Sequence, residues 1–297
     1  MISKEPIVRE LCQRWQVPFP EMAIRAAIAE AFPELASKVP PVNVHALAAR
    51  RGVISISESS LDCDGVISVT ASGAYSIEVN RDHPRVRQRF TIAHEVGHTF
   101  FFDLGRREDK RYRIRDDSLD GMTRSSAEEQ LCNFAAAEIL MPDHQFANLA
   151  RETGPTASSL RDLAKKFDVS LQAAARRVAD TLSLNITVAL WEYDASTSTY
   201  ATSWLHRGAS GRGPGKRKLR IKKTDPGFGI LHSKDQFRGR MWVSLGGQLD
   251  DYFVDVAAFQ KGDRRSVLTV FVLERNPSLF FKRLAANRAT GEQLRLV

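Results

Sequence analysis

The sequence predicts an α+β protein whose chain ends in a separate β-rich domain. Three observations support this class. Apolar residues recur at helical spacing around residues 90–102 and 127–140. Short β-branched runs at 65–69 and 75–79 precede both of these helices. From residue 185 onward, β-branched and aromatic runs separated by Gly and Pro replace the helical spacing.

These shifts in pattern divide the chain into four predicted parts. A helical arm is followed by an α+β core, then by a helical segment that looks like a helix-turn-helix, and last by the β-rich domain. The parts are expected at residues 1–37, 38–145, 146–184 and 185–297.

The first part of the chain is expected to be helical up to residue 36. Its Ala-rich stretch 21–32 has apolar residues on one face and follows two prolines that suit a helix start. After the Val39-Pro40-Pro41 break, Asn43 is a plausible N-cap for a short helix over 44–50. A strand is expected over 53–56.

A hairpin and a helix pair are expected next. The runs 65–69 and 75–79 flank a short Gly-containing turn, which is typical of a β-hairpin. Pro84 then opens a long helix that reaches Phe102. The charge-dense stretch 105–126 is interpreted as a surface loop, and a second strong helix follows at 127–140.

The rest of the chain is expected to change from helices to strands. Helices over 159–167 and 171–182 flank a Val169-Ser170 turn. This pair has two interpretations, a structural cover for the core or a DNA-reading helix-turn-helix, and its short positive face favours the first. Strands are expected over 186–193, 200–205, 241–245, 252–259 and 266–273, with a closing helix over about 277–287.

Composition indicates a folded soluble protein. The 297 residues are 43% hydrophobic and 26% charged. Cys12, Cys63 and Cys132 are too few and too scattered for a disulfide framework, so a reducing cytoplasm is expected. The N-terminus lacks the pattern of a signal peptide, and no run of 18 apolar residues suggests a membrane span.

The net charge of +8 comes from one segment, residues 207–223, which contains eight bases and no acid. The other 35 bases balance the 35 acids of the chain. Arg207–Lys223 is therefore either a solvated Gly-rich loop or a surface that contacts nucleic acid or an acidic partner. Trp204 lies nearby, but one aromatic residue does not make a stacking platform.

The stretch Phe90–Phe102 contains the motif H-E-x-x-H. On a helix, His94 and His98 are about 40° apart and about 6 Å along the axis, so both imidazoles can reach one cation. Glu95 lies beside them and can act as a general base toward a water on that cation. Zinc suits this arrangement because neutral imidazole is a good zinc ligand. The alternative is a core helix with two hydrogen-bonded histidines.

A catalytic zinc site needs a third protein ligand. Glu128 and Glu129, in the first turn of the helix at 127–140, are the candidates, although acids there also favour the helix dipole. Cys132 lies on the same helix and is interpreted as a small packing residue. His144 and His232 are interpreted as surface or core residues.

Three segments together resemble the ImmA/IrrE family of metallopeptidases. They are R-Q-R-F-T-I-A-H-E-V-G-H at 87–98, E-x-x-C-N-x-x-A-A-E-I-L-M-P at 129–142, and L-A-K-K-F-D-V-S-L-Q-A-A-A-R-R-V at 163–178. They follow the order and spacing of the family, and the resemblance covers about residues 38–183. The C-terminal domain lies outside it.

The resemblance implies a zincin-like core and a set of functional residues. His94 and His98 match the histidine ligands, Glu95 the catalytic glutamate, and Glu129, rather than Glu128, the third ligand. It also implies a cytoplasmic zinc endopeptidase that cuts a regulatory protein, often a helix-turn-helix repressor. The alternative is a non-proteolytic transcription regulator or adaptor, against which Glu95 argues because a structural metal site needs no base.

Overall fold

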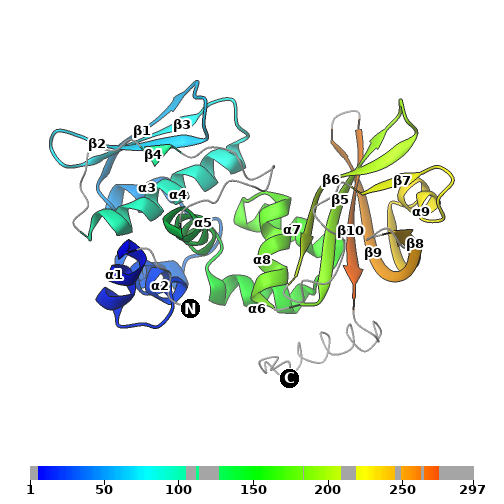
Figure 1. Ribbon diagram of the computed structural model, residues 1–297, viewed down its shortest axis with the longest axis horizontal. Coiled ribbons are helices and arrows are strands. Elements are labelled where there is room, and N and C mark those ends of the chain that lie inside the picture. Colours follow the sequence, from blue (N-terminus) through cyan, green and yellow to red (C-terminus); the bar gives the residue numbers. More distant parts are fainter. Residues whose placement is uncertain are drawn as a thin grey trace. The chain divides into compact units, whose positions relative to one another are not determined.

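The structure is a computed structural model of the chain (Figure 1). It describes residues 6–104, 112–113, 127–182, 184–208, 219–244, 249–261 and 264–273. The chain forms two compact units, Met1–His144 with Lys166–Ser170, and Gln145–Lys165 with Leu171–Val297. Most of the helical segment predicted at 146–184 thus groups with the C-terminal strands, and the four-part division stays a prediction.

The first unit contains a mixed sheet and most of the helices. In chain order its elements are α1 (Pro6–Trp15), α2 (Pro20–Ala31), the 3-10 helix η1 (Pro33–Ala36), α3 (Val44–Arg50), β1 (Val53–Ser59), β2 (Gly65–Val69), β3 (Tyr75–Asn80), α4 (Arg85–Phe102), β4 (Tyr112–Arg113) and α5 (Ala127–Leu140). The helix predicted at 127–140 is confirmed at those bounds, and Asn43 caps α3 by accepting a hydrogen bond from the amide of Ala46 at 3.1 Å.

The sheet of this unit has the strand order β1-β3-β2-β4. The predicted hairpin is confirmed, since β2 pairs antiparallel with β3 and Gly73 takes a positive φ of 80° in the turn between them. A positive φ is a conformation that glycine adopts without steric cost. β1 pairs parallel with β3 on the far side. β4 pairs with β2, so part of the stretch predicted as a loop is a strand.

The long helix α4 is the centre of this unit. It contacts β2, β3, α3 and α5, and Figure 1 shows it between the sheet and α5. From Thr91 to Phe102 every residue of α4 is buried. A turn of this helix therefore presents its polar side chains to protein on all sides rather than to solvent.

Two arginines anchor the start of α4 to a turn that lies much later in the sequence. Arg89 donates hydrogen bonds to the carbonyl oxygens of Asp168 (3.1 Å) and Val42 (3.0 Å), and Arg85 donates to the Asp168 carboxylate at 2.9 Å. Asp168 follows α7 (Ala157–Phe167) and has a positive φ of 54°. The turn predicted as the middle of a helix-turn-helix thus binds the N-terminal end of α4.

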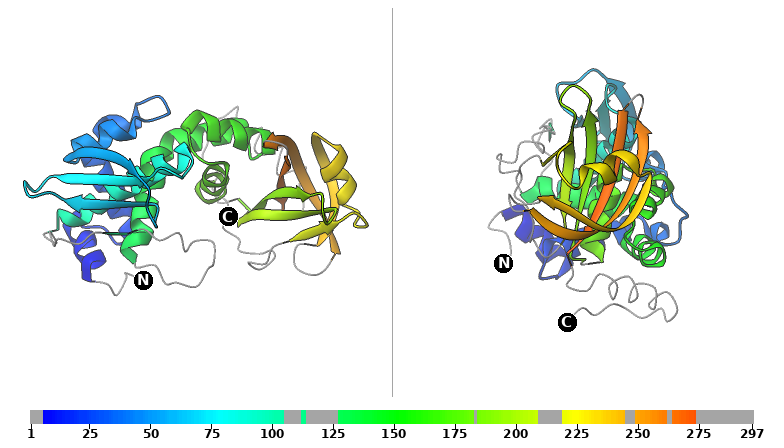
Figure 2. Two further views of the ribbon diagram at one scale, coloured as in Figure 1. Left: turned by 90° about the horizontal axis from the view of Figure 1, so that it is seen from above. Right: turned by 90° about the vertical axis from the view of Figure 1, so that its right-hand side faces the viewer.

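The second unit is an antiparallel sheet with helices before it. Its elements are α6 (Asp143–Thr153), which starts at the end of the first unit, α7, α8 (Leu171–Thr181), β5 (Ile186–Asp194), β6 (Thr199–Arg207), β7 (Arg220–Lys222), α9 (Phe228–Ser233), β8 (Gln236–Ser244), β9 (Leu249–Lys261) and β10 (Arg264–Val272). The strand order is β7-β6-β5-β10-β9-β8. Figure 2 shows that this sheet curls strongly.

The core of the second unit lies on one face of that sheet. Trp191, Tyr200 and Phe271 are fully buried there with Val and Met side chains of neighbouring strands. Each of the five predicted strands overlaps an observed strand, although β8 begins five residues before the predicted start at 241. α6, α9 and the short strand β7 were not predicted. The predicted closing helix at 277–287 lies outside the described residues. No helix among the described residues combines the length and apolarity needed to cross a membrane.

Candidate metal centre

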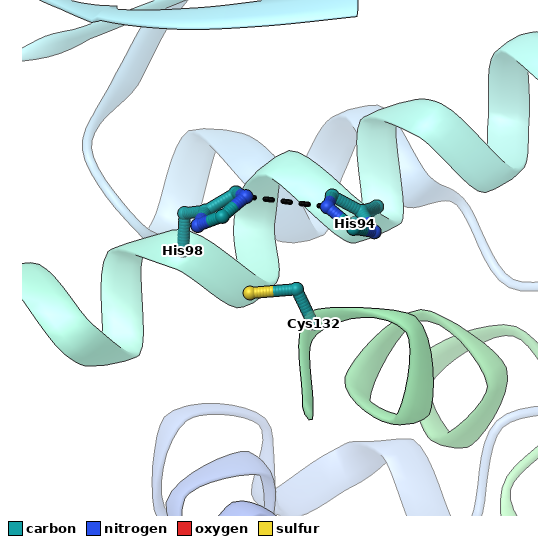
Figure 3. A group of neighbouring side chains, drawn as sticks. All are labelled: His94, His98 and Cys132. Carbon is teal, nitrogen blue, oxygen red and sulfur yellow. Dashed lines mark hydrogen bonds between the residues drawn. The ribbon is translucent and has the colours of Figure 1, made fainter. Parts of the chain in front are cut away.

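The H-E-x-x-H motif lies on α4, as the sequence predicted. His94, Glu95 and His98 each have 0% of their surface exposed. The Nε2 atoms of His94 and His98 are 3.2 Å apart, so the two rings converge on one point (Figure 3). The i, i+4 spacing brings them together because residues four apart lie on the same helix face.

α5 can approach this turn of α4 because residue 97 is a glycine. A Cβ on Gly97 would lie 3.1 Å from Cα of Cys132 and 3.3 Å from Cβ of Ala135. Any larger residue would push the two helices apart. The glycine inside the motif therefore sets how closely the first turns of α5 come to the histidines.

Glu129 is the carboxylate that α5 brings to the histidines. One of its oxygens lies 3.2 Å from Nε2 of His94, and the other lies 3.5 Å from Nε2 of His98. Ligand atoms at about 2.0–2.2 Å from a tetrahedral zinc ion are separated by roughly 3.3–3.6 Å. The spacing of these three groups therefore fits a zinc ion bound by all of them.

The outer ring nitrogens have partners of their own. Nδ1 of His94 lies 3.0 Å from Oδ1 of Asn133, and Nδ1 of His98 lies 3.2 Å from a Glu128 oxygen. Both partners can accept a hydrogen bond, which assigns the proton of each neutral ring to Nδ1. The Nε2 lone pairs of both rings then face the Glu129 carboxylate. These three acceptor groups converge on one point, where a bound cation would accept their lone pairs.

The charges of this cluster follow from its burial. Burial lowers the pKa of His94. Burial would also lower the pKa of His98, but Cys132, Glu128 and Glu95 outweigh it and hold that pKa well above its usual value. Burial alone would raise the pKa of Glu129, yet the two histidines lower it. Without a cation, the cluster thus holds an ionised carboxylate beside an imidazole that takes up a proton.

Glu95 is the least satisfied carboxylate in the described part of the chain. It is fully buried, and neither oxygen has a partner at ordinary hydrogen-bond geometry. Burial is the main cause that raises its pKa to about 8; Glu129 adds to the rise, while His98 and the main chain of Ile67 oppose it. A carboxyl group with such a pKa can take up and release a proton near neutral pH.

β2 approaches α4 closely beside Glu95. A Cβ on Gly65 would clash with Cγ2 of Thr91 and lie 3.6 Å from a Glu95 oxygen. From the sequence alone, Gly65 marks only the start of a strand. Its role in this close approach, like that of Asn133 beside His94, becomes visible only when the elements are packed.

Cys132 also lies at the cluster, although it was predicted to be a packing residue. Single donor atoms of His94, His98 and Cys132 all lie within 4.8 Å of one another. Figure 3 shows the Cys132 side chain extending from α5 toward the turn of α4 that carries the two rings. Its burial raises the pKa of the thiol to about 11.

The other weighed residues are not brought to this cluster. His144 is exposed on α6, and His232 on α9 stacks on Phe228 with the ring centroids 5.0 Å apart. Residues 209–218, which carry half of the basic segment 207–223, lie outside the described residues.

Comparisons with known proteins agree with the geometry. Residues 47–179 match the family model described as the IrrE N-terminal-like domain. The "Radiation response metalloprotease IrrE" of Deinococcus radiodurans is 42% identical over 88 residues, which are 30% of this chain and 26% of the relative. The protein of the same name from Deinococcus deserti is 32% identical over 167 residues, or 54% of each chain.

The match thus spans at most about half the length of these two curated relatives. A solved structure titled "Mycobacterium tuberculosis transcriptional regulator" aligns over 90% of this chain and 80% of its own, with a TM-score of 0.49 and 14% identity. The resemblance predicted from the motifs is confirmed by the family match over residues 47–179.

Proposed function

Residues 47–179 match the IrrE N-terminal-like domain, and on that premise we propose that this chain is a zinc-dependent endopeptidase of the ImmA/IrrE type. One observation supports the proposal most strongly. The Nε2 atoms of His94 and His98 and the carboxylate of Glu129 converge within 3.2–3.5 Å beside a buried, unpartnered Glu95.

His94, His98 and Glu129 would hold the zinc ion. Glu128 and Asn133 accept hydrogen bonds from the outer ring nitrogens and orient the rings. Such outer partners commonly change metal affinity by about 10- to 100-fold when they are removed. When bound, zinc would polarise the peptide carbonyl and activate a water toward attack. This assignment favours Glu129 over Glu128 because Glu129 faces both Nε2 atoms.

Glu95 would act as the general base and then as the general acid. Its carboxylate accepts a proton from the attacking water and delivers that proton to the leaving amine. Its carboxylate has no side-chain partner among the described residues, and burial raises its pKa to about 8 in the metal-free protein. Glu95 makes no contact that would identify it as a metal ligand.

The substrate class follows from the family alone. We propose that the chain cuts a regulatory protein, such as a helix-turn-helix repressor, in the cytoplasm. The two relatives are named metalloproteases, which supports a protein substrate. We also propose that the mixed sheet with α4 and α5 is a zincin-like core and that α7 and α8 are a helix-turn-helix-like extension.

DNA reading by α8 draws little support from the described side chains. The exposed Arg176 pairs with Asp180 at 3.7 Å, and Arg177 is buried. Little free positive charge therefore remains on this helix for phosphate contacts. The regulator alternative stays a prediction that depends on the basic segment 207–223.

The test measures zinc content and cleavage on the same preparations. Wild-type protein should hold one zinc per chain and cut peptides of a proteome-derived library, with cleavage sites identified by mass spectrometry. His94→Ala and Glu129→Gln should lose most of the zinc and the cleavage, because too few ligands remain. Glu128→Gln should weaken zinc by only about 10- to 100-fold. His144→Ala, an exposed histidine, is the control and should keep both properties.

Two outcomes would overturn the proposal. If His94→Ala keeps stoichiometric zinc, the metal lies elsewhere. If Glu128→Gln loses more zinc than Glu129→Gln, the ligand assignment on α5 is reversed.

A further inference from the structure

Cys132 occupies a fixed place on the helix face that forms the metal centre. It lies one turn after Glu129 on α5 and has 0% of its surface exposed. A Cβ added to Gly97 would lie 3.1 Å from Cα and 3.3 Å from Cβ of Cys132. The crossing of α4 and α5 therefore holds the backbone of Cys132 directly against the motif helix.

Cys132 differs from the two other cysteines in what surrounds it. Cys63 donates a hydrogen bond to the carbonyl oxygen of Gly65 at 3.5 Å, and Cys12 lies in the apolar face of α1. Cys132 instead lies with ring nitrogens of His94 and His98 in one group whose donor atoms are within 4.8 Å of one another. Imidazole nitrogen and thiolate sulfur are the two ligand types that zinc binds best in proteins.

We propose that Cys132 is a further metal-binding residue of this centre, so that a resting metal ion is held by two imidazoles, one carboxylate and one thiolate. The inference rests on the proposed function, because it takes His94, His98 and Glu129 as ligands. A metal ion ionises a thiol that it binds, even one whose burial otherwise keeps it protonated. The thiolate then competes with water for the fourth position of a tetrahedral ion.

Two consequences follow for the centre. A set of four protein ligands is typical of structural zinc, whereas a catalytic ion keeps one position for water. Cys132 therefore makes the resting form tighter and less reactive than a site with three ligands. It also shifts the preference of the centre toward metals that bind sulfur, such as zinc and cobalt, and away from magnesium and manganese.

The experiment uses the full-length chain loaded with cobalt(II), whose absorption reports its ligands. Wild-type protein should show an intense near-ultraviolet charge-transfer band from thiolate to cobalt. Cys132→Ala should bind cobalt without that band and should bind zinc at least about tenfold more weakly. Cys12→Ala and Cys63→Ala are matched controls, since each removes a buried cysteine outside the cluster, and both should keep the band.

The wild-type spectrum decides the matter even if Cys132→Ala fails to fold. Cobalt bound by wild-type protein without the band would overturn this inference and leave the proposed function standing. A wild-type chain that binds neither cobalt nor zinc would overturn both. A band that persists in Cys132→Ser, which keeps the size of the side chain, would place the thiolate elsewhere and contradict the assignment.

Discussion

Two buried carboxylates, one in each unit, differ in their hydrogen-bond partners. Asp255 on β9 is 7% exposed and has a donor at each oxygen: the amide of Ala157 at 2.7 Å and Nε of Arg238 at 2.7 Å. Glu95 on α4 is 0% exposed, and within the described residues neither of its oxygens has a side-chain partner. Both are acidic side chains with little or no exposed surface.

This contrast separates a structural carboxylate from a candidate catalytic one. Burying a charge costs several kcal/mol or more unless hydrogen bonds or an opposite charge compensate it, so stability alone favours the arrangement of Asp255. Glu95 is kept at a cost in stability. Such a carboxylate is best explained by a group that the polypeptide does not itself provide, which is the metal ion and substrate of the proposed reaction.

The largest difference between the two units should appear when zinc is removed. At free zinc about 1,000 times its dissociation constant, binding stabilises the folded site by about 4 kcal/mol. Chelation should therefore speed amide hydrogen exchange in α4 and α5 and leave β5 and β10 nearly unchanged. Mass spectrometry of exchanged fragments measures this. Equal loss of protection in both units would show that the metal does not act through the α4–α5 pair.

The second-largest effect should be on how the stability of the metal-free protein depends on pH. In the metal-free protein the pKa of Glu95 is raised from 4.5 to about 8. Between these values the unfolded chain holds fewer protons at this residue than the folded chain, so stability falls as pH rises through that window. Glu95→Gln lacks this ionisation and should gain up to a few kcal/mol over wild type by pH 9. Urea unfolding at pH 4 and 9 checks it; a pH-independent difference would refute it.

The smallest change in stability should come from the matched substitution in the second unit, at Asp255. Asp255→Asn keeps the size of the side chain but loses the charged pair with Arg238. It should destabilise the protein by about 1–3 kcal/mol, the cost typical of losing a hydrogen bond to a charged group. The loss should lie in the lower part of this range, because the Arg238 side chain is 52% exposed and water weakens its ion pair with Asp255. Urea unfolding would measure it, and a stabilised Asp255→Asn would remove the contrast with Glu95.

The sequence predicted most of what depends on local pattern. The hairpin, α4, α5 and the strands of the C-terminal sheet follow from periodicity and turn residues, and the spacing of His94 and His98 places both on one helix face. α6 was missed because it buries only Phe146, Ala147 and Ala150, too few apolar positions to mark a helix in the sequence. α9 spans six residues, too few to show a period.

What the sequence could not predict depends on packing between elements. The choice between Glu128 and Glu129 requires the rotation of α5 against α4, which Gly97 helps to set. Asn133 and Cys132 carry no motif of their own, and each gains a role only by lying against a histidine ring. The apolar setting of Cys132 on its own helix predicted packing, whereas its position at the metal centre comes from the neighbouring helix.

If Glu95 is the catalytic base, its loss should abolish cleavage while the zinc stays bound. The rate of peptide cleavage by zinc-loaded Glu95→Gln, with zinc content measured on the same sample, tests this. Glutamine keeps the size of the side chain but cannot accept the proton of the attacking water. We expect one zinc per chain, an unchanged fold and a rate lower by about 10²- to 10⁴-fold. A variant that holds zinc and cleaves at the wild-type rate would contradict it.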